Sequence, residues 1–210
     1  AHRAHASIDG VARLIPSAAG RLMQRELEAL DQALTHPTHP VAAIVGGNKI
    51  STKLGVLENL IHKVDHLIVG GAMANTFLYA TGVTVGSSLC EEDMSKTARN
   101  IIDKARYSNC IIHLPVDAVV APKLSDGSAS NIASIDAIPP EKMILDVGPG
   151  TLDNIEAVLG TCKTLVWNGP LGAFEFKPFD AGTNAVAKSA SKLTEAGKLL
   201  TVAGGGDTMS

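Results

Sequence analysis

Residues 41–57 read VAAIVGGNKISTKLGVL, and their pattern recurs along most of the chain. Val41 to Val45 are continuously apolar, a glycine turn follows at Gly46-Gly47, and apolar residues at helical spacing begin at Leu54. A strand without polar alternation is typical of a parallel sheet that is covered on both faces. The stretch therefore predicts one strand–turn–helix unit of an α/β fold.

Further short apolar strands follow the first one. We predict them at residues 67–69, 111–114, 118–121, 144–147, 164–167 and 199–203. Helical patterns lie between several of them, at residues 54–64 and 185–193, and a Ser88-x-x-Glu91 capping box predicts a third helix that ends near Tyr107. Strands that alternate with helices predict a three-layer α/β fold, with a mostly parallel sheet and helices on both faces, as in Rossmann-like nucleotide-binding lobes.

A long amphipathic helix precedes this region. Apolar residues recur at helical spacing from Ser17 to Leu34, and Pro16 is acceptable in a first turn. Residues 35–40, THPTHP, end the helix because two prolines lack backbone donors and disfavour helical geometry before them. We place a domain boundary there. We interpret His36 and His39 as solvated turn residues, since the linker has no Cys or acid to complete a metal site.

Composition excludes several classes of protein. Of the 210 residues, 45% are hydrophobic and 19% are charged, which is ordinary globular usage and argues against a disordered chain. The 4 Phe, 2 Tyr and 1 Trp are too few for a base-stacking nucleic-acid surface. A net charge of −3 provides no broad positive field for nucleic acid or anionic lipid. Anion recognition must therefore be local.

The cysteines indicate a reducing compartment. Cys90, Cys110 and Cys162 are odd in number and widely spaced, so neither a disulfide framework nor a zinc ribbon is expected. No apolar run approaches the roughly 18 residues of a membrane span, and the opening segment lacks the apolar stretch of a signal peptide. We expect a soluble cytoplasmic protein. The chain starts without Met and stops soon after a glycine cluster that should open a helix, so we expect both ends to be cut.

Five turns that follow predicted strands are unusual. They read Gly46-Gly47-Asn48-Lys49, Gly70-Gly71-Ala72, Gly148-Pro149-Gly150, Asn168-Gly169-Pro170-Leu171-Gly172 and Gly204-Gly205-Gly206-Asp207-Thr208. Ligands of open parallel sheets bind beyond the carboxyl ends of the strands. Glycine lets backbone N–H groups approach a ligand closely, and a following helix N-terminus adds partial positive charge. Helix and strand packing would explain any one of these turns, but five at one edge predict a phosphate site.

The common phosphate-binding motifs are missing from the chain. It lacks the Walker pattern Gly-x-x-x-x-Gly-Lys-Ser/Thr, and Asp153 stands where a dinucleotide turn beginning at Gly148 needs its third glycine. Lys49 and Lys53 are four residues apart at the start of an expected helix, where two cations oppose the helix dipole unless an anion is bound. Asp207 follows three glycines and is the natural ligand for Mg²⁺, although it would also serve as a helix N-cap.

Several strings then resemble one family. GGNKISTKLGVL, LIVGGAMANTF, VWNGPLGAFEF and VAGGGDT, with AHRAHAS at the front, closely resemble phosphoglycerate kinase over essentially the whole chain. The resemblance implies a glycolytic enzyme that transfers a phosphoryl group reversibly between 1,3-bisphosphoglycerate and ADP, giving 3-phosphoglycerate and ATP, with Mg²⁺. Members have two lobes. Residues 1–16 resemble the end of the amino-terminal substrate lobe, residues 17–40 the interdomain helix and linker, and residues 41–210 most of the nucleotide-binding lobe.

The resemblance also implies roles for residues. Lys53, Lys49 and Gly205 are the implied catalytic residues, and Asp207 is the implied Mg²⁺ ligand. The implied nucleotide contacts are Gly46, Gly47, Lys53, Gly70, Gly71, Ala72, Asn168, Pro170, Glu175, Gly205, Gly206, Asp207 and Thr208. Of these, Gly70, Gly71 and Ala72 would line the adenine slot, Glu175 would accept hydrogen bonds from the ribose hydroxyls, and Asn168 would lie beside the phosphate path.

Arg3 resembles the residue that grips the phosphate of phosphoglycerate, and His5 lies close to it in the sequence. Two positions depart from the family pattern. Asn48 stands where Ala or Ser is usual, and Ala72 where Gly is common. We expect tighter packing around the nucleotide and an altered affinity, but no change of reaction type.

The expected chemistry needs no general base. Positioning and cations suffice for phosphoryl transfer, and a carboxylate acceptor is already ionised at pH 7. We expect small-molecule substrates, a monomeric chain, no nucleic-acid or membrane partner, and hinge closure about residues 17–40. Two alternatives stay open. The chain could bind nucleotide without turnover, because most of the acid-binding lobe is missing, or it could be an inert α/β domain whose glycines serve turns.

Overall fold

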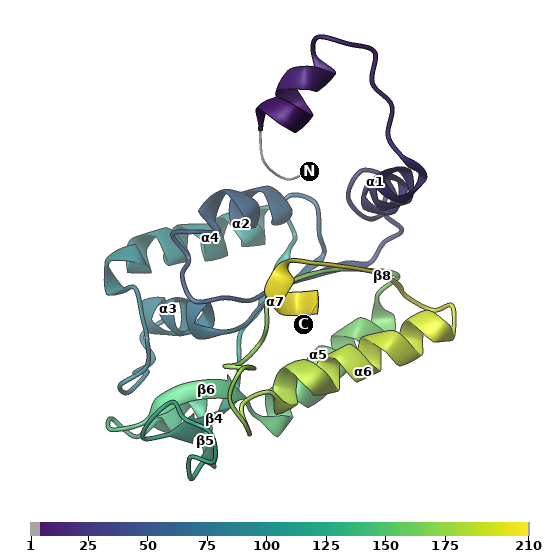
Figure 1. The fold of residues 1–210 in the computed structure, drawn as a ribbon. Coiled ribbons are helices and arrows are strands. Elements are labelled where there is room, and N and C mark those ends of the chain that lie inside the picture. The colour runs from purple at the N-terminus through teal and green to yellow at the C-terminus, as the bar shows by residue number, and fades with distance from the viewer. Residues whose placement is uncertain (1–4, 210) are drawn as a thin grey trace.

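A five-stranded parallel sheet forms the centre of the computed structural model, which describes residues 5–209 (Figure 1). The strand order is β3 (Ile111–His113), β2 (His66–Val69), β1 (Val41–Val45), β7 (Thr164–Asn168) and β8 (Leu200–Gly204). Each neighbouring pair is parallel, with Val45 opposite both Val69 and Asn168. Five of the predicted strands and the α/β class are therefore confirmed.

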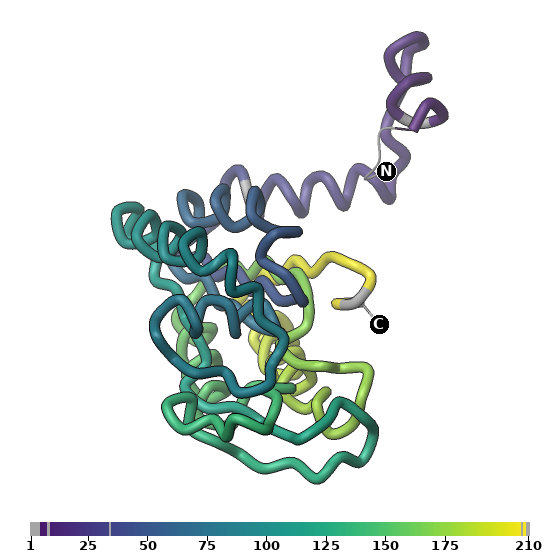
Figure 2. Tube along the Cα trace, turned by 90° about the vertical axis from the view of Figure 1, so that its left-hand side faces the viewer, coloured from purple at the N-terminus to yellow at the C-terminus, as the bar shows by residue number. Residues whose placement is uncertain are grey.

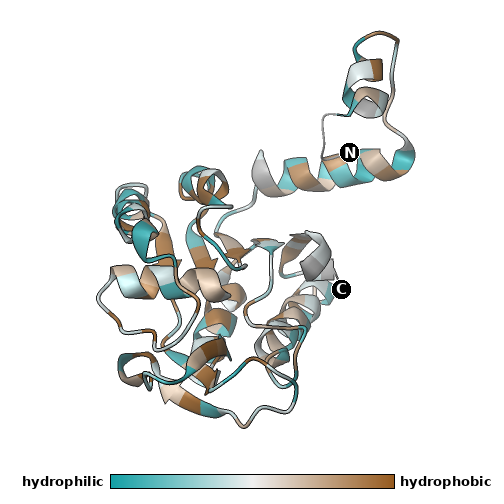
Figure 3. Ribbon diagram, turned by 60° about the vertical axis from the view of Figure 1, so that its left-hand side comes forward, coloured by the Kyte–Doolittle hydropathy of each residue, from teal (hydrophilic) through white to brown (hydrophobic). Residues whose placement is uncertain are grey.

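Helices cover both faces of this sheet. On one face lie α2 (Leu54–Leu60), α3 (Ala72–Ala80) and α4 (Ser95–Tyr107), and on the other lie α5 (Pro149–Thr161) and α6 (Ala181–Glu195). Successive side chains of a strand point to opposite faces, so Val41, Ala43 and Val45 pack toward the first layer and Ala42 and Ile44 toward the second. Figure 3 shows the hydrophobic residues concentrated in the strands between the helices. The prediction of three layers is confirmed.

A second, antiparallel sheet was not expected. It consists of β5 (Asn131–Ser134), β4 (Asp117–Ala121) and β6 (Met143–Val147), with β4 in the middle. The strands predicted at 118–121 and 144–147 therefore exist, but their placement in the mostly parallel sheet was wrong. The reason is physical, because a continuous apolar run shows that a strand is buried without showing which strand it pairs with. β5, which is mostly exposed, has no apolar run and was missed.

Two predicted helix starts are also corrected. The long helix α1 (Arg21–Leu34) begins four residues later than predicted, because residues 16–20 are not helical and its N-cap Gly20 is extended. Ser88 does not cap a helix, since its hydroxyl donates to the carbonyl of Val85 and accepts the N–H of Ile144. A 3₁₀ turn η2 (Glu92–Met94) intervenes, and α4 then begins at Ser95. A further 3₁₀ turn, η3 (Ile135–Ala137), follows β5.

The amino-terminal segment projects from the rest of the molecule (Figure 2). It contains a short π-helical turn, η1 (Ala6–Gly10), and α1, whose end contacts β7 and β8. Ala33 is buried there, whereas Leu22 and Leu27 are 73% and 54% exposed. The apolar face of α1 that the sequence predicts is therefore largely uncovered in this chain. No helix in the described range 5–209 is long and apolar enough to cross a membrane.

Candidate functional site

Four of the five glycine turns meet at the carboxyl edge of the parallel sheet, because they follow the neighbouring strands β2, β1, β7 and β8. Their backbones approach closely. A Cβ on Gly46 would lie 1.8 Å from the carbonyl oxygen of Pro170, and one on Gly71, which has φ +66°, would lie 2.6 Å from that of Gly47. The N–H of Gly71 donates to the carbonyl of Leu171 at 2.8 Å. Glycine is thus needed here because the backbones of neighbouring turns pack too closely for a Cβ, whether or not a ligand binds.

Two adjoining cavities open at this edge. One is predominantly apolar, with a volume of about 360 Å³, and the other is more polar, with a volume of about 520 Å³. Six residues line both cavities: Gly47, Asn48, Leu124, Pro170, Gly172 and Ala173. A ligand with one apolar and one polar part can therefore occupy both across this shared wall.

The apolar cavity contains two of the three residues expected around adenine. Gly71 and Ala72 line it, together with Met143 and Leu145 of the second sheet. Gly70 does not line the apolar cavity. It is buried beneath Leu171, and a Cβ on Gly70 would lie 2.4 Å from Cδ2 of Leu171. Gly70 therefore supports the cavity wall by admitting the Leu171 side chain.

Both predicted lysines line the polar cavity. Their four-residue spacing on a helix, from which they were predicted, is not what brings them there. Lys49 and Lys53 precede α2, and Lys53 is its N-cap, so the two do not share a helical face. Lys53 instead reaches across the sheet edge, where its Nζ donates to Gly46 O at 2.7 Å and to Asn168 Oδ1 at 2.5 Å. Its ammonium group is thereby fixed between β1 and β7. Glu175 lines the same cavity.

The turn after β8 lies beside Asn168. It leads into α7 (Gly206–Met209), and Gly205 has φ +101°, a backbone conformation that favours glycine. Asn168 Nδ2 donates to Gly204 O at 3.0 Å, and Thr208 Oγ1 accepts the N–H of Gly169 at 2.7 Å. This turn is therefore anchored to the β7 turn, although none of its described side chains lines the two cavities.

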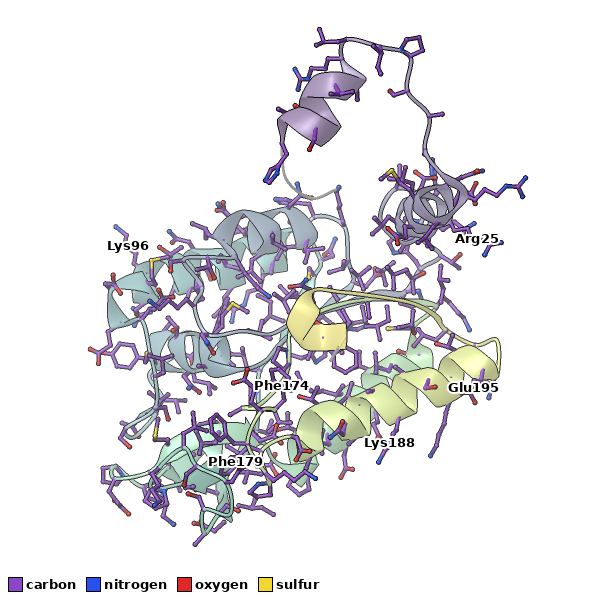
Figure 4. The ribbon with its side chains drawn as sticks, in the orientation of Figure 1. Arg25, Lys96, Phe174, Phe179, Lys188 and Glu195 are labelled. Carbon is purple, nitrogen blue, oxygen red and sulfur yellow. The ribbon has the colours of Figure 1, made fainter. Side chains whose placement is uncertain are left out.

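Thr208 lines a third cavity of about 510 Å³, together with Trp167 and residues of α6. Phe174, which also lines it, lies near the middle of the molecule below α7 (Figure 4). Phe179 marks the second sheet in the same view, and Lys188 and Glu195 mark α6. The third cavity thus lies on the α6 side of the sheet and shares Phe174 with the lining of the polar cavity.

A metal ion at this site would need ligands from its substrate. Within the part of the chain that the structure describes, no group of three or more His, Cys, Asp or Glu residues is placed to hold a metal. Mg²⁺ fits such a site because it takes one or two carboxylates and completes its shell with phosphate oxygens and water. The side chain of Asp207, the predicted ligand, lies outside the described part.

The histidines of the linker do have acids nearby, contrary to the expectation. His36 Nδ1 lies 3.3 Å from Asp31 Oδ2, and His39 Nδ1 lies 2.6 Å from Asp65 Oδ2. Both imidazoles are exposed. The premise that no acid lies near these histidines was therefore wrong. Asp65 was missed because it is distant in sequence.

The fifth glycine turn is not part of the site. Gly148-Pro149-Gly150 follows β6, which belongs to the second sheet, and it opens α5. Asp117 occupies the donors there: its carboxylate accepts the N–H groups of Gly150 at 2.8 Å and Thr151 at 2.7 Å, and the Thr151 hydroxyl at 2.6 Å. The prediction of five turns at one edge was therefore wrong for this one.

Asp146 performs a similar role at α6. It is buried, and its carboxylate accepts the N–H groups of Gly182 at 2.7 Å and Val147 at 2.9 Å. Burial raises the pKa of Asp146 to about 7, an effect that these two hydrogen bonds oppose. Asp146 also lines the apolar cavity. Sequence reasoning missed it because a lone acid inside a strand pattern gives no signal of its surroundings.

Of the two residues expected to bind the acid, Arg3 lies outside the described residues, and His5 is exposed at the first described position. The residues expected around a nucleotide are only partly brought together. Those that line the two adjoining cavities are Gly46, Gly47, Lys53, Gly71, Ala72, Pro170 and Glu175, whereas Gly70, Asn168 and the described side chains of the β8 turn do not.

Comparisons with known proteins agree with the geometry. The sequence profile of the family described as phosphoglycerate kinase matches residues 1–210. Phosphoglycerate kinases of Cereibacter sphaeroides and Agrobacterium fabrum are 58% and 56% identical to the whole of this chain, which covers 53% and 52% of their lengths. The chain thus spans about half the length of these curated relatives.

Solved structures show the same relation. A phosphoglycerate kinase from Coxiella burnetii matches with a TM-score of 0.92 at 44% identity, over 100% of this chain and 53% of its own. One from Pyrococcus horikoshii matches with a TM-score of 0.80 at 27% identity, over 99% of this chain and 57% of its own. By this agreement along its entire length, the chain belongs to the phosphoglycerate kinase family.

Proposed function

We propose that residues 41–210 are the nucleotide-binding lobe of a phosphoglycerate kinase, which transfers a phosphoryl group reversibly between 1,3-bisphosphoglycerate and ADP. The observation that carries this proposal is the apolar cavity that adjoins a lysine-lined polar cavity at the carboxyl edge of the sheet. A nucleoside diphosphate has this composition, with a flat, weakly polar base at one end and charged phosphates at the other. In this proposal, residues 1–16 belong to the substrate lobe and residues 17–40 are the interdomain helix and linker.

The nucleotide would bind across the shared wall. The base enters between Ala72 and Leu171, and the ribose hydroxyls donate to Glu175 in the polar cavity. The phosphates then lie near Lys49 and Lys53, and the backbone N–H groups of Gly205, Gly206 and Asp207 approach them from β8, with Thr208 beside them. Gly46, Gly47 and Pro170 line the polar cavity and keep the path narrow.

The chemistry follows from charge and position. Charge spreads over the transferred phosphoryl oxygens in the transition state, so fixed donors lower the barrier without a general base. Lys53 is held by Gly46 O and Asn168 Oδ1, and such a preorganised ammonium group requires little reorganisation when charge develops. Gly205 contributes a backbone N–H. Mg²⁺, held by Asp207 and the phosphates, would neutralise phosphate charge when bound.

The acid must come from outside this lobe. We propose that Arg3 and His5 contact the phosphate of 3-phosphoglycerate, and that bending about residues 17–40 brings the acid to the nucleotide and excludes water. The projecting amino-terminal segment supports such a movable connection (Figure 2). All three cysteines are unpaired thiols, which agrees with the proposed cytoplasmic location. We also propose that the protein acts as a monomer on small molecules.

Calorimetric titration tests the binding proposal. We expect the folded 210-residue chain to bind Mg-ADP and Mg-ATP, with heat release and an increased melting temperature. Absence of heat and of a thermal shift at millimolar Mg-ADP, on a chain shown to be folded by circular dichroism, would contradict it.

A second candidate function is nucleotide binding without turnover by the chain as it stands. Its support is that the chain spans about half the length of its curated relatives. A coupled assay compares this chain with a polypeptide of the relatives' full length at equal folded concentration. We expect ATP formation from 1,3-bisphosphoglycerate only by the longer polypeptide. Steady turnover by the 210-residue chain would exclude the second candidate.

A further inference from the structure

The loop between β1 and α2 is held by contacts outside the polar cavity. Lys49, Thr52 and Lys53 of this loop line the cavity. The two intervening residues, Ile50 and Ser51, do not line it. Ile50 is buried in the core beneath α2 and α3, which belong to one helix layer (Figure 1). The loop is thus attached to the protein through residues 50 and 51 and presents its lysines to the cavity.

Ser51 is bound by the carboxylate of Glu91. The Ser51 N–H donates to Glu91 Oε2 at 3.1 Å, and the Ser51 hydroxyl donates to Glu91 Oε1 at 2.6 Å. Burial raises the pKa of Glu91, but hydrogen bonds from Ser51 and Ile50 and the charge of Lys49 outweigh burial, so this pKa lies below its ordinary value. Glu91 is therefore ionised at neutral pH, and hydrogen bonds to an ionised acceptor are stronger than neutral ones.

Glu91 is itself fixed to α3. Its N–H donates to Thr76 Oγ1 at 3.0 Å, and Thr76 is buried in that helix. The capping box predicted for Ser88 and Glu91 does not form, and the Glu91 carboxylate binds a residue 40 positions earlier in the chain instead. The lysine-bearing loop is therefore tied to α3 through one acid.

We propose that Glu91 is a positioning residue, which through Ser51 holds the loop that carries Lys49 and Lys53 in the geometry that receives phosphates. This inference rests on the proposed nucleotide-binding function. A mobile loop must be ordered when the ligand binds, which lowers affinity, whereas a loop that is already held avoids this loss. Glu91 lines neither of the two adjoining cavities, so it acts on the ligand through the loop.

Two substitutions of Glu91 separate position from charge. Glu91→Gln removes the charge but keeps both contacts, because its amide oxygen accepts the Ser51 N–H and its amide nitrogen donates to the hydroxyl, which can also accept. Glu91→Ala removes the charge and both contacts. In calorimetric titration of the folded 210-residue chain, we expect Glu91→Ala to bind Mg-ADP about tenfold more weakly than wild type. Glu91→Gln should bind it at least as tightly as wild type, since a negative charge near the phosphates is removed.

A role in charge alone predicts a different result. The two variants would then change the affinity equally, and this outcome would overturn the inference. Glu92→Ala is the matched control, because it removes the same charge from the next residue, whose carboxylate accepts the Tyr79 hydroxyl. It should keep the wild-type affinity for Mg-ADP. A tenfold loss in this control as well would mean that the effect is not specific to Glu91, and the inference would fail.

A double-mutant cycle tests whether Glu91 acts through Ser51. Ser51→Ala loses the hydroxyl contact and keeps the N–H contact, so we expect it to weaken Mg-ADP binding about threefold. In the Glu91→Ala background the same substitution should have no further effect, because its partner is already absent. Additive losses would contradict the proposed connection. If Glu91→Ala does not fold, Ser51→Ala decides at its exposed position, and an unchanged affinity there would overturn the inference.

Adenosine shows whether the effect is confined to the phosphates. It has none, so wild type and Glu91→Ala should bind it equally. Equal weakening of adenosine and Mg-ADP would reveal a general disturbance of the site and would overturn the inference. If wild type binds no nucleoside diphosphate, the proposed function fails and this inference falls with it. If wild type and Glu91→Ala bind Mg-ADP equally, only this inference fails.

Discussion

Two glycine turns that follow strands have different roles in this molecule. The turn at Gly46-Gly47 lines a polar cavity with Lys53, whereas the turn at Gly148-Pro149-Gly150 meets the carboxylate of Asp117. Both lie between a strand and the next helix, where glycine is the usual signal of a phosphate site. At Gly148 a Cβ would lie 2.4 Å from the Asp117 carboxyl carbon, so glycine there admits a protein side chain.

The difference shows that a glycine turn before a helix indicates a bound anion. It does not show whether that anion is a carboxylate of the protein or part of a ligand. At α5 and α6 the anion is a carboxylate of the protein, Asp117 and Asp146 respectively. At the carboxyl edge of the parallel sheet, Lys49 and Lys53 line the cavity, and cations near donors favour an external anion. The nearby charged side chains thus distinguish a structural turn from a binding turn.

The largest effect is expected at Lys53. In the full-length enzyme, Lys53→Ala should lower kcat by about 10²–10³, because one fixed donor at the developing charge is lost. Steady-state kinetics on folded protein measure it. Lys63→Ala, an exposed lysine just after α2, is the control and should leave kcat unchanged. Near-normal turnover in Lys53→Ala would assign the role to another group.

Asp146 should make stability depend on pH. Burial raises its pKa to about 7 in the folded chain, so the folded state binds the proton more tightly than the unfolded state, where the value is 3.8. Its stabilising contribution is therefore present below pH 4 and is lost as the pH rises through 7. The loss should be on the order of 3 kcal/mol between pH 4 and pH 8.

Urea unfolding of the wild type and of Asp146→Asn across this range measures the difference. The variant should be less stable at low pH, since its amide nitrogen cannot accept an N–H, and it should lack this pH-dependent loss. An equal pH slope in the two proteins would show that Asp146 titrates normally.

Substitution of Asp117 tests whether the turn before α5 serves stability and not nucleotide binding. Asp117→Ala should lower the free energy of unfolding by about 2 kcal/mol, because Gly150 and Thr151 lose their acceptor. Nucleotide affinity should not change. Asp117→Asn, which keeps one acceptor, should recover part of the stability. Weaker ADP binding by a folded Asp117→Ala chain would mean that this turn belongs to the site after all.

The smallest effect is expected at Asp207. Asp207→Ala should weaken ADP binding about tenfold with Mg²⁺ and leave binding without Mg²⁺ unchanged, because the carboxylate is proposed to act through the metal. Asp153→Ala, an exposed acid on α5, controls for net charge. Equal losses of ADP affinity with and without Mg²⁺ would show that Asp207 is not a metal ligand.

The parts of the fold that depend on local pattern were predictable from the sequence. Val41–Val45 could be recognised as a buried strand because its apolar run is uninterrupted and a glycine turn follows. The partner of a strand is a long-range property, which is why β4 and β6 were assigned to the wrong sheet. The glycine turn after β6 was assigned to the wrong edge for the same reason.

The candidate site shows the same division. Lys49 and Lys53 were found from a charge conflict, although the helical geometry assumed for them was wrong. Asp146 was missed, because a buried polar residue is distinguished by its partners, and its partner Gly182 comes from another element. Asp117, which fills the α5 donors, lies more than thirty residues before them in the sequence.

Amide chemical-shift mapping tests the central claim most directly. Mg-ADP is added to the isotopically labelled 210-residue chain, and the backbone N–H signals of the two kinds of turn are compared. We predict large shifts at Gly47 and Gly205, and unchanged signals at Gly150 and Thr151, whose donors are occupied by Asp117. Shifts at Gly150 and Thr151 with none at the sheet edge would contradict the account.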